Sequence, residues 1–181
     1  MQFAIRRGII VDSDNDFEGL LLSDVLYVLS REYRFAGNSP YSVLHHSVAM
    51  GMVATAVGAS PSVVSGCVTH DFQEAFVRDV PTQVKRRLTG YEELEREFYN
   101  ALMLRFETHN LYKLSIPEQD YIWKWDKLAC AVELASFTSL DRTADFSEDH
   151  ITLFSEILLS TRHLTYDRLC KRVESMLCFD S

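Results

Sequence analysis

The chain has 181 residues, of which 47% are hydrophobic and 24% are charged. A chain of this length and composition is expected to fold as one soluble globular domain with a substantial core. Its 26 acidic and 18 basic residues give a formal net charge of −8, which argues against a broad phosphate-binding surface and hence against a nucleic-acid polymer as partner. A few basic residues can still hold one small anion in a pocket, because net charge governs non-specific binding more than a local site.

The cysteines show no CxxC spacing and lie in segments predicted to be helical, so neither a zinc ribbon nor a disulfide framework is indicated. No window approaches the roughly 18 apolar residues of a membrane span, and residues 1–12 contain no apolar stretch of signal length. We therefore expect a cytoplasmic protein with no membrane partner. The cysteines are Cys67, Cys130, Cys170 and Cys178.

Apolar residues recur at helical spacing from residue 17 onward, and no alternating strand pattern competes with them. Ser60 and Pro61 form an N-cap and first helical position, and Pro81 opens a short basic turn. The predicted class is therefore all-α, with a single compact helical domain over residues 1–181. The predicted helices cover 17–33, 42–57, 60 to about 74, 91–106, 117–137, 145–159 and 165–178.

Two histidines and two aspartates stand out as candidate ligands. His70 and Asp71 are adjacent near the end of an apolar helix, His46 lies on the preceding helix, and Asp126 is flanked at helical spacing by apolar residues. Such a nitrogen and oxygen set suits a divalent transition metal with positions open for water and substrate. Each residue also has a simpler explanation: an ion pair or interhelical hydrogen bond for Asp126, and a hydrogen-bonded core position for His46. Trp123 and Trp125 are assigned to core packing.

Five stretches of the sequence carry a resemblance to a known family. In their order and content they resemble the HD-domain metal-dependent phosphohydrolases, most closely the small bacterial 5'-deoxynucleotidases and the short phage dATP and dNTP triphosphohydrolases. They cover most of residues 24–137, whereas the helices over 145–178 carry no motif and are expected to be a scaffold or a subunit interface. The stretches are 29–37, Tyr41–Val48, Thr69–Ala75, Asp79–Lys85 and Lys124–Leu128.

The resemblance implies that His46, His70, Asp71 and Asp126 are the metal ligands. His46 is selected over His45 because the family places its histidine directly before the serine. The implied ion is a divalent transition metal (Co, Mn, Zn, Ni or Fe), with additional Mg²⁺ accompanying the nucleotide.

Further roles follow from the same resemblance. Glu74 matches the glutamate that orients the attacking water, with a salt-bridged surface residue as the alternative. Asp79 matches the aspartate near the leaving 5' oxygen and could act as a general acid, with a helix cap before Pro81 as the alternative.

The substrate contacts implied by the resemblance are basic and aromatic. Lys85 matches the residue that faces the phosphates, and Arg34 with Phe35 matches the pair at the substrate mouth, where the ring can pack against a 2' carbon. Ordinary solvation and loop anchoring are the alternatives. Asn38 stands where the nucleotidase subgroup commonly has a histidine.

Taken together, the resemblance implies a metal-dependent deoxynucleotide phosphohydrolase. The first expectation is a dATP (dNTP) triphosphohydrolase that releases deoxynucleoside and triphosphate by attack of a metal-activated water. The alternatives are a 5'-deoxynucleotidase acting on dNMPs and a catalytically silent helical nucleotide-binding or scaffold module. A homo-oligomer is expected, in the host cytoplasm if the chain is phage-encoded.

Overall fold

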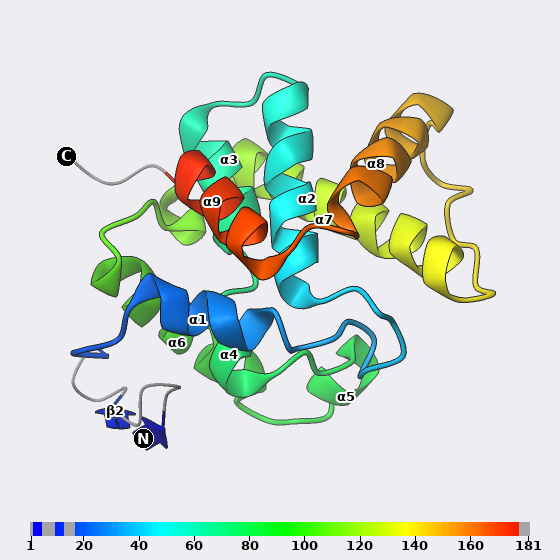
Figure 1. The fold of residues 1–181 in the computed structure, drawn as a ribbon. Coiled ribbons are helices and arrows are strands. Elements are labelled where there is room, and N and C mark those ends of the chain that lie inside the picture. Colours follow the sequence, from blue (N-terminus) through cyan, green and yellow to red (C-terminus); the bar gives the residue numbers. More distant parts are fainter. Residues whose placement is uncertain (1, 5–9, 13–16, 178–181) are drawn as a thin grey trace.

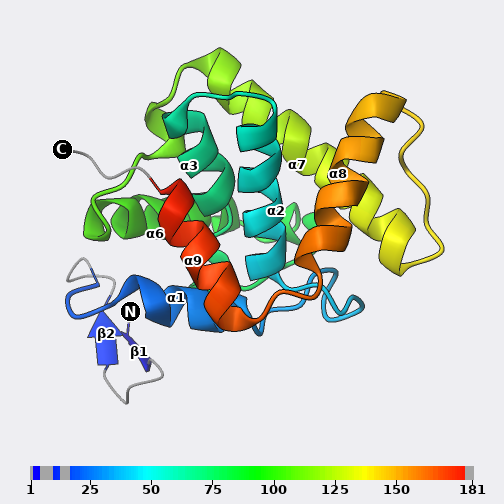
Figure 2. The same cartoon turned by 45° about the horizontal axis from the view of Figure 1, so that its top comes forward.

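Helix α2 (Val43–Ala56) lies at the centre of the molecule, with α3 (Pro61–Thr69) and α9 (Tyr166–Met176) to one side and α8 (Glu148–Thr161) to the other (Figures 1 and 2). The computed structural model describes residues 2–4, 10–12 and 17–177. Helix α1 (Leu22–Leu29) crosses below α2 and α9 in Figure 1. Helix α2 is apolar on nearly every face, as expected for a helix surrounded by others.

Two helix starts occur where the sequence predicts them. The hydroxyl of Ser42 accepts a hydrogen bond from the backbone N–H of His45 at the start of α2, and the hydroxyl of Ser60 accepts one from Val63 at the start of α3. Each hydroxyl satisfies one of the backbone donors left without a partner in the first helical turn. The prediction of α2 is therefore confirmed to within one residue at each end.

Helix α1 is shorter than the predicted helix over residues 17–33. Phe17 and Gly19 have φ values of 55° and 82°, in the left-handed region, so the chain turns before the helix begins. Asp24 then closes the first turn, because its Oδ2 accepts a hydrogen bond of 3.0 Å from the backbone N–H of Leu21. The apolar residues keep their helical spacing through this turn, so the sequence pattern did not indicate where the helix begins.

The segment after α3 is not a continuation of that helix but is divided into shorter elements. Helix α3 ends at Thr69, and His70 is its C-cap, so the predicted continuation to about Glu74 is wrong. Two four-residue helices follow, α4 (Glu74–Val77) and α5 (Thr82–Lys85). This break places His70 and Asp71 at a helix end, where their side chains can face other elements.

The second half of the chain is helical as predicted, with small differences at the ends. A capping box at Ser115 and Glu118 starts α7, the longest helix at 22 residues. The predicted end of the last helix at Cys178 lies outside the described residues. None of the described helices is long and apolar enough to cross a membrane. The remaining elements are α6 (Tyr91–Arg105), the 3-10 turn η2 (Leu111–Lys113) and α7 (Ile116–Phe137).

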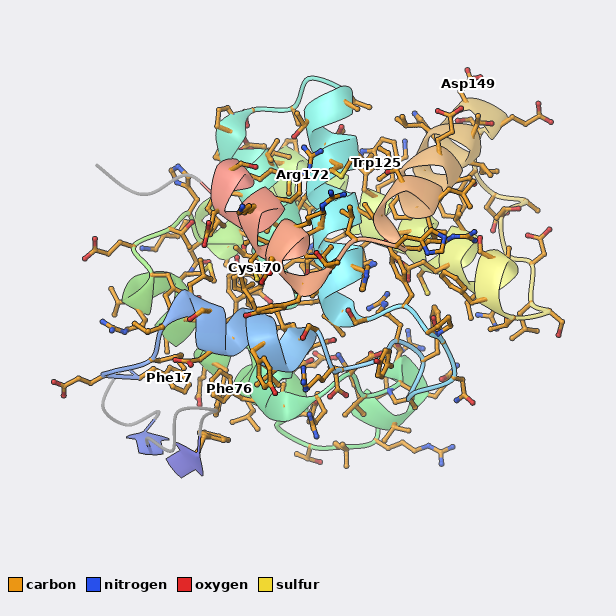
Figure 3. The ribbon with its side chains drawn as sticks, in the orientation of Figure 1. Phe17, Phe76, Trp125, Asp149, Cys170 and Arg172 are labelled. Carbon is orange, nitrogen blue, oxygen red and sulfur yellow. The ribbon has the colours of Figure 1, made fainter. Side chains whose placement is uncertain are left out.

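A small β-hairpin departs from the all-α prediction, which otherwise describes the fold correctly. Strands β1 (Gln2–Ala4) and β2 (Ile10–Asp12) pair antiparallel. Phe3 packs against Phe76 with ring centroids 5.0 Å apart and against Phe98 at 5.5 Å. Phe17 and Phe76 lie next to each other at the same edge (Figure 3). Strands of three residues are too short to show an alternating pattern, so the sequence could not indicate them.

Candidate metal centre

Three helices bring two histidines and an aspartate together inside the molecule. His46 comes from α2, His70 from the end of α3 and Asp126 from α7, and a ligand atom from each lies within 4.8 Å of the others. Nε2 of His46 is 3.2 Å from Nε2 of His70 and 3.3 Å from Oδ1 of Asp126. Both histidines are buried. This group, defined as the metal group, could hold a metal ion.

Asp71 faces the metal group from the end of α3. Its Oδ2 lies 3.2 Å from Nε2 of His70 and 3.7 Å from Nε2 of His46. The structure therefore brings all four predicted ligands to one place. The side chain of Asp126 is 31% exposed, against 14% for Asp71 and 0% for both histidines, so the group opens to solvent on the Asp126 side.

The second ring nitrogen of each histidine has an acceptor. Nδ1 of His70 lies 2.8 Å from the backbone carbonyl oxygen of Cys67, and Nδ1 of His46 lies 2.7 Å from Oε1 of Glu133. A carbonyl and a carboxylate can only accept, so both Nδ1 atoms carry hydrogen and each Nε2 is the ring nitrogen that faces the metal group. This is the usual arrangement of metal-ligating histidines. His45 is placed elsewhere, with its Nδ1 2.7 Å from Oγ of Ser42, so His46 rather than His45 belongs to the metal group.

The charges around the metal group favour a cation. Burial lowers the pKa of His70, but Asp71 and Asp126 outweigh it and raise that pKa well above the usual value. The pKa of His46 is raised as well, because the carboxylates Glu133 and Asp126 outweigh burial and the charge of Arg34. Burial raises the pKa of both aspartates, yet the adjoining imidazoles hold those values below the usual range.

Two clefts meet at the metal group, and Asp71, Lys85 and Asp126 line both of them. The first, which we name the arginine cleft, has a volume of about 480 Å³. The second, named the glutamate cleft, has a volume of about 650 Å³. The arginine cleft is lined by Arg34, Phe35, Glu74, Asp79, Pro81, Cys130, Leu134, Leu140 and Arg142, among others. The glutamate cleft is lined by His70, Gln73, Glu92, Glu93, Glu95, Arg96, Tyr112 and Trp123, together with the three shared residues.

Glu74 is a buried residue of the arginine cleft, only 3% exposed, so the alternative of a surface salt bridge is wrong. Burial, together with the charges of Asp71 and Asp79, raises the pKa of its carboxyl well above the usual value. Within the described part of the chain, Oε2 of Glu74 and Oε1 of Gln73 are buried without a hydrogen-bond partner. Such atoms need a partner from a water molecule or a ligand.

The two predicted cations of the site are held by carboxylates. Nζ of Lys85 lies 2.6 Å from Oε1 of Glu95 and 3.7 Å from Oε1 of Glu74. Arg34 is buried, with its Nε 3.2 Å from Oε2 of Glu133 and its Nη1 3.4 Å from Oδ2 of Asp71. Both side chains therefore have fixed positions beside the metal group.

The backbone of the loop after Arg34 is tied to Asp79. Phe35 and Ala36 have φ values of 59° and 54°, and the backbone N–H of Phe35 donates a hydrogen bond of 3.0 Å to Oδ2 of Asp79. No side chain caps α5, whose N-cap is Pro81, so the alternative of Asp79 as a helix cap is wrong. The Asp79 carboxylate instead holds Phe35 at the edge of the arginine cleft.

Two residues of the site were missed in the sequence. Glu133 is fully buried and contacts His46, and it lies seven residues after Asp126, a spacing that puts both on one face of α7. The seven-residue spacing from Asp126 could therefore have identified Glu133 as a residue of the site.

Trp123 borders the glutamate cleft and its ring lies 6.4 Å from that of His70, so assignment to the core alone is wrong. Trp125 does pack in the core, against His150 of α8 (Figure 3).

Comparison with known proteins does not assign this chain. No family model matches it, and no curated protein matches it. The likeness to HD-domain phosphohydrolases therefore stays a prediction from the motifs, to which the structure adds an all-helical body and a buried group of two histidines and an aspartate.

Proposed function

We propose that the protein is a metal-dependent deoxynucleotide phosphohydrolase, with dATP or another dNTP as its first candidate substrate. The observation that carries the proposal is the convergence of two imidazole Nε2 atoms and a carboxylate oxygen at the junction of two clefts. Both Nδ1 atoms bond to acceptors behind the rings, which leaves each Nε2 as the nitrogen available to a metal, and Asp71 faces the same point. These donors fit a divalent transition metal such as Co²⁺, Mn²⁺, Zn²⁺, Ni²⁺ or Fe²⁺.

The chemistry is divided among residues of the arginine cleft. A bound divalent ion would lower the pKa of water and draw negative charge from the phosphate. Glu74, whose carboxylate is a stronger base than an ordinary one because burial raises its pKa, is suited to orient that water and to accept its proton. Arg34 and Lys85 stabilise the charge on the phosphate oxygens, and Asp79 is the candidate that protonates the leaving 5' oxygen.

The second cleft supports a triphosphate substrate. Attack at the phosphorus nearest the sugar breaks its bond to the 5' oxygen, so the nucleoside and the remaining phosphates leave in different directions. With the sugar beside Phe35 in the arginine cleft, the phosphate tail would extend into the glutamate cleft, because the two clefts share Asp71, Lys85 and Asp126. Glu92, Glu93 and Glu95 repel bare phosphate, so we expect the tail to enter with divalent cations such as Mg²⁺.

A specific observation favours a second candidate, a 5'-deoxynucleotidase that acts on dNMPs. Arg34 and Lys85 are each already bound to carboxylates, which leaves less positive charge for a substrate. A monophosphate needs fewer cations than a triphosphate. It also needs only the arginine cleft.

One assay separates these candidates. The purified protein is incubated with dATP, the other dNTPs and dAMP in the presence of Co²⁺ or Mn²⁺, and the products are resolved by anion exchange. Deoxyadenosine with tripolyphosphate supports the triphosphohydrolase, whereas turnover of dAMP alone supports the nucleotidase. The matched control is the Asp126→Asn protein, purified in parallel.

The same assay tests a non-catalytic role. A metal-loaded protein that turns over none of these nucleotides contradicts the hydrolase and leaves a nucleotide-binding or scaffold module. Metal content is measured on the same preparation, so that an inactive but metal-free sample is not counted as a result.

A further inference from the structure

Glu133 lies between a metal ligand and a substrate-binding residue and contacts both. Its Oε1 is 2.7 Å from Nδ1 of His46, and its Oε2 is 3.2 Å from Nε of Arg34. The side chain is 0% exposed. A buried carboxylate is costly unless it is fully paired, and here each oxygen has its own donor.

The contacts of Glu133 form part of a closed ring of side chains. Arg34 also reaches Asp71, with Nη1 3.4 Å from Oδ2, and the same Oδ2 lies 3.7 Å from Nε2 of His46. The ring therefore runs from His46 through Glu133, Arg34 and Asp71 and back to His46. A displacement of the guanidinium changes the surroundings of two candidate ligands at once.

We propose that Glu133 is a positioning residue that couples the metal ligand His46 to the substrate-binding Arg34. One oxygen keeps hydrogen on Nδ1 of His46, so that Nε2 stays available to the metal. The other oxygen fixes the direction of the Arg34 guanidinium toward the arginine cleft. The part that concerns Arg34 rests on the proposed function, whereas the part that concerns His46 rests on the metal group alone.

The role requires a carboxylate, and this makes it testable by an isosteric change. A carboxylate offers two acceptors, one for each N–H, but the glutamine in a Glu133→Gln protein offers one acceptor and one donor. If its oxygen faces His46, the amide donor faces the Nε–H of Arg34. If its oxygen faces Arg34, the amide donor faces Nδ1 of His46 and favours the tautomer that cannot bind metal through Nε2. Either orientation removes one half of the coupling.

The first measurement is metal affinity, by calorimetric titration of Co²⁺ into protein freed of metal, together with the visible spectrum of the Co²⁺ complex. With the amide oxygen toward Arg34, Glu133→Gln should bind Co²⁺ 10–100-fold more weakly, the range typical of partners behind a metal ligand, with an altered spectrum. The matched control is Glu118→Gln on the same helix, where glutamine also suits the capping box. It should retain the wild-type affinity.

The second measurement is KM at saturating metal, using whichever nucleotide the wild-type protein hydrolyses. With the amide oxygen toward His46, Glu133→Gln should raise KM, because Arg34 is then no longer held in place. Since the metal titration needs no turnover, weaker metal binding supports the His46 part even if the protein proves not to be a hydrolase.

The result that overturns the proposal is a folded Glu133→Gln protein with Co²⁺ affinity within twofold of wild type, an unchanged spectrum and an unchanged KM. If thermal unfolding shows that this variant does not fold, Glu133→Asp takes its place, because it keeps the charge that balances Arg34 but is one methylene too short to reach both partners. A loss of Co²⁺ affinity in folded Glu133→Asp supports the role, and wild-type affinity overturns it.

Discussion

Helix α2 serves two regions of opposite character. Around His46, the neighbours are ionisable side chains, including the buried Arg34 and Glu133. Around Gly51, on another face of the helix, the neighbours are apolar: a Cβ there would lie 2.4 Å from Cγ2 of Val68 and 2.8 Å from Sδ of Met176. Buried charges contribute little net stability, whereas close apolar packing contributes most of it. The metal region is thus supported by the apolar region, and the two should respond differently to substitution.

The largest effect is expected from the metal region, with Asp126→Asn. Loss of a carboxylate ligand should abolish stoichiometric binding of Co²⁺ or Mn²⁺ and reduce hydrolysis to background. Metal analysis after gel filtration checks the binding, and the anion-exchange assay checks the activity. Retention of metal by the folded variant would show that Asp126 is not a ligand.

Removal of the metal by a chelator tests how much the bound ion stabilises the folded protein. A ligand at 100 times its Kd stabilises the folded protein by about 2.7 kcal/mol, which corresponds to roughly 5–10 °C in Tm for a domain of this size. EDTA should lower the Tm of metal-loaded wild type by that amount and leave Asp126→Asn unchanged. Equal Tm values with and without metal in wild type contradict a bound ion.

Glu74→Gln should separate activity from stability. Loss of the water-orienting carboxylate is expected to lower kcat by about 10²–10⁴-fold. The folded-state pKa of Glu74 is raised from its ordinary value of 4.5 by burial and by Asp71 and Asp79. The folded state therefore binds this proton more tightly than the unfolded state does, and ionisation of Glu74 destabilises the protein as pH rises above 4.5.

The same ionisation predicts how the Tm of Glu74→Gln differs from that of wild type. Glutamine does not ionise, so metal-free Glu74→Gln should have a higher Tm than metal-free wild type once the pH exceeds 4.5, and the difference should grow as the pH rises toward the raised pKa of Glu74. Thermal melts of both proteins across this range give the measurement. A Tm difference that shrinks as pH rises would contradict the burial of an ionisable Glu74.

Gly51→Ala tests the apolar region. The added methyl group has no room beside Val68 and Met176, so we expect a loss of about 1–3 kcal/mol, as for other overpacked cores. Urea unfolding measures the loss. Metal content should stay at the wild-type level, because the substitution leaves the ligands untouched; a parallel loss of metal would mean that the two regions are not independent.

The smallest effect is expected at the β-hairpin, with Phe3→Leu. The substitution removes the ring contacts of Phe3 with Phe76 and Phe98 while keeping an apolar side chain. Such ring contacts contribute about 0.5–1.5 kcal/mol beyond burial, so we expect a loss of about 1 kcal/mol in urea unfolding. Unchanged stability would mean that the hairpin contributes little to the fold.

Local signals in the sequence predicted most of the helices. The predicted helix start at residue 42 and the predicted cap at Ser60 with Pro61 lie at true helix starts, because capping is settled within a single turn. The same local reasoning was wrong over residues 17–21, where left-handed turn residues interrupt an apolar pattern of helical spacing. Periodicity reports which face is apolar, and not where the backbone turns.

By itself, the sequence determined the helical class and the start of α3, because both depend on residue type and near-neighbour spacing, and its resemblance to a known family supplied the four candidate ligands. The tertiary structure decided the rest. His46 and Glu133 are 87 positions apart, and their contact exists only because α2 and α7 pack together. The orientation of the His46 ring, the burial of Glu74 and the meeting of the two clefts likewise depend on groups distant in sequence. Local spacing carries no information about such contacts until the helices are packed.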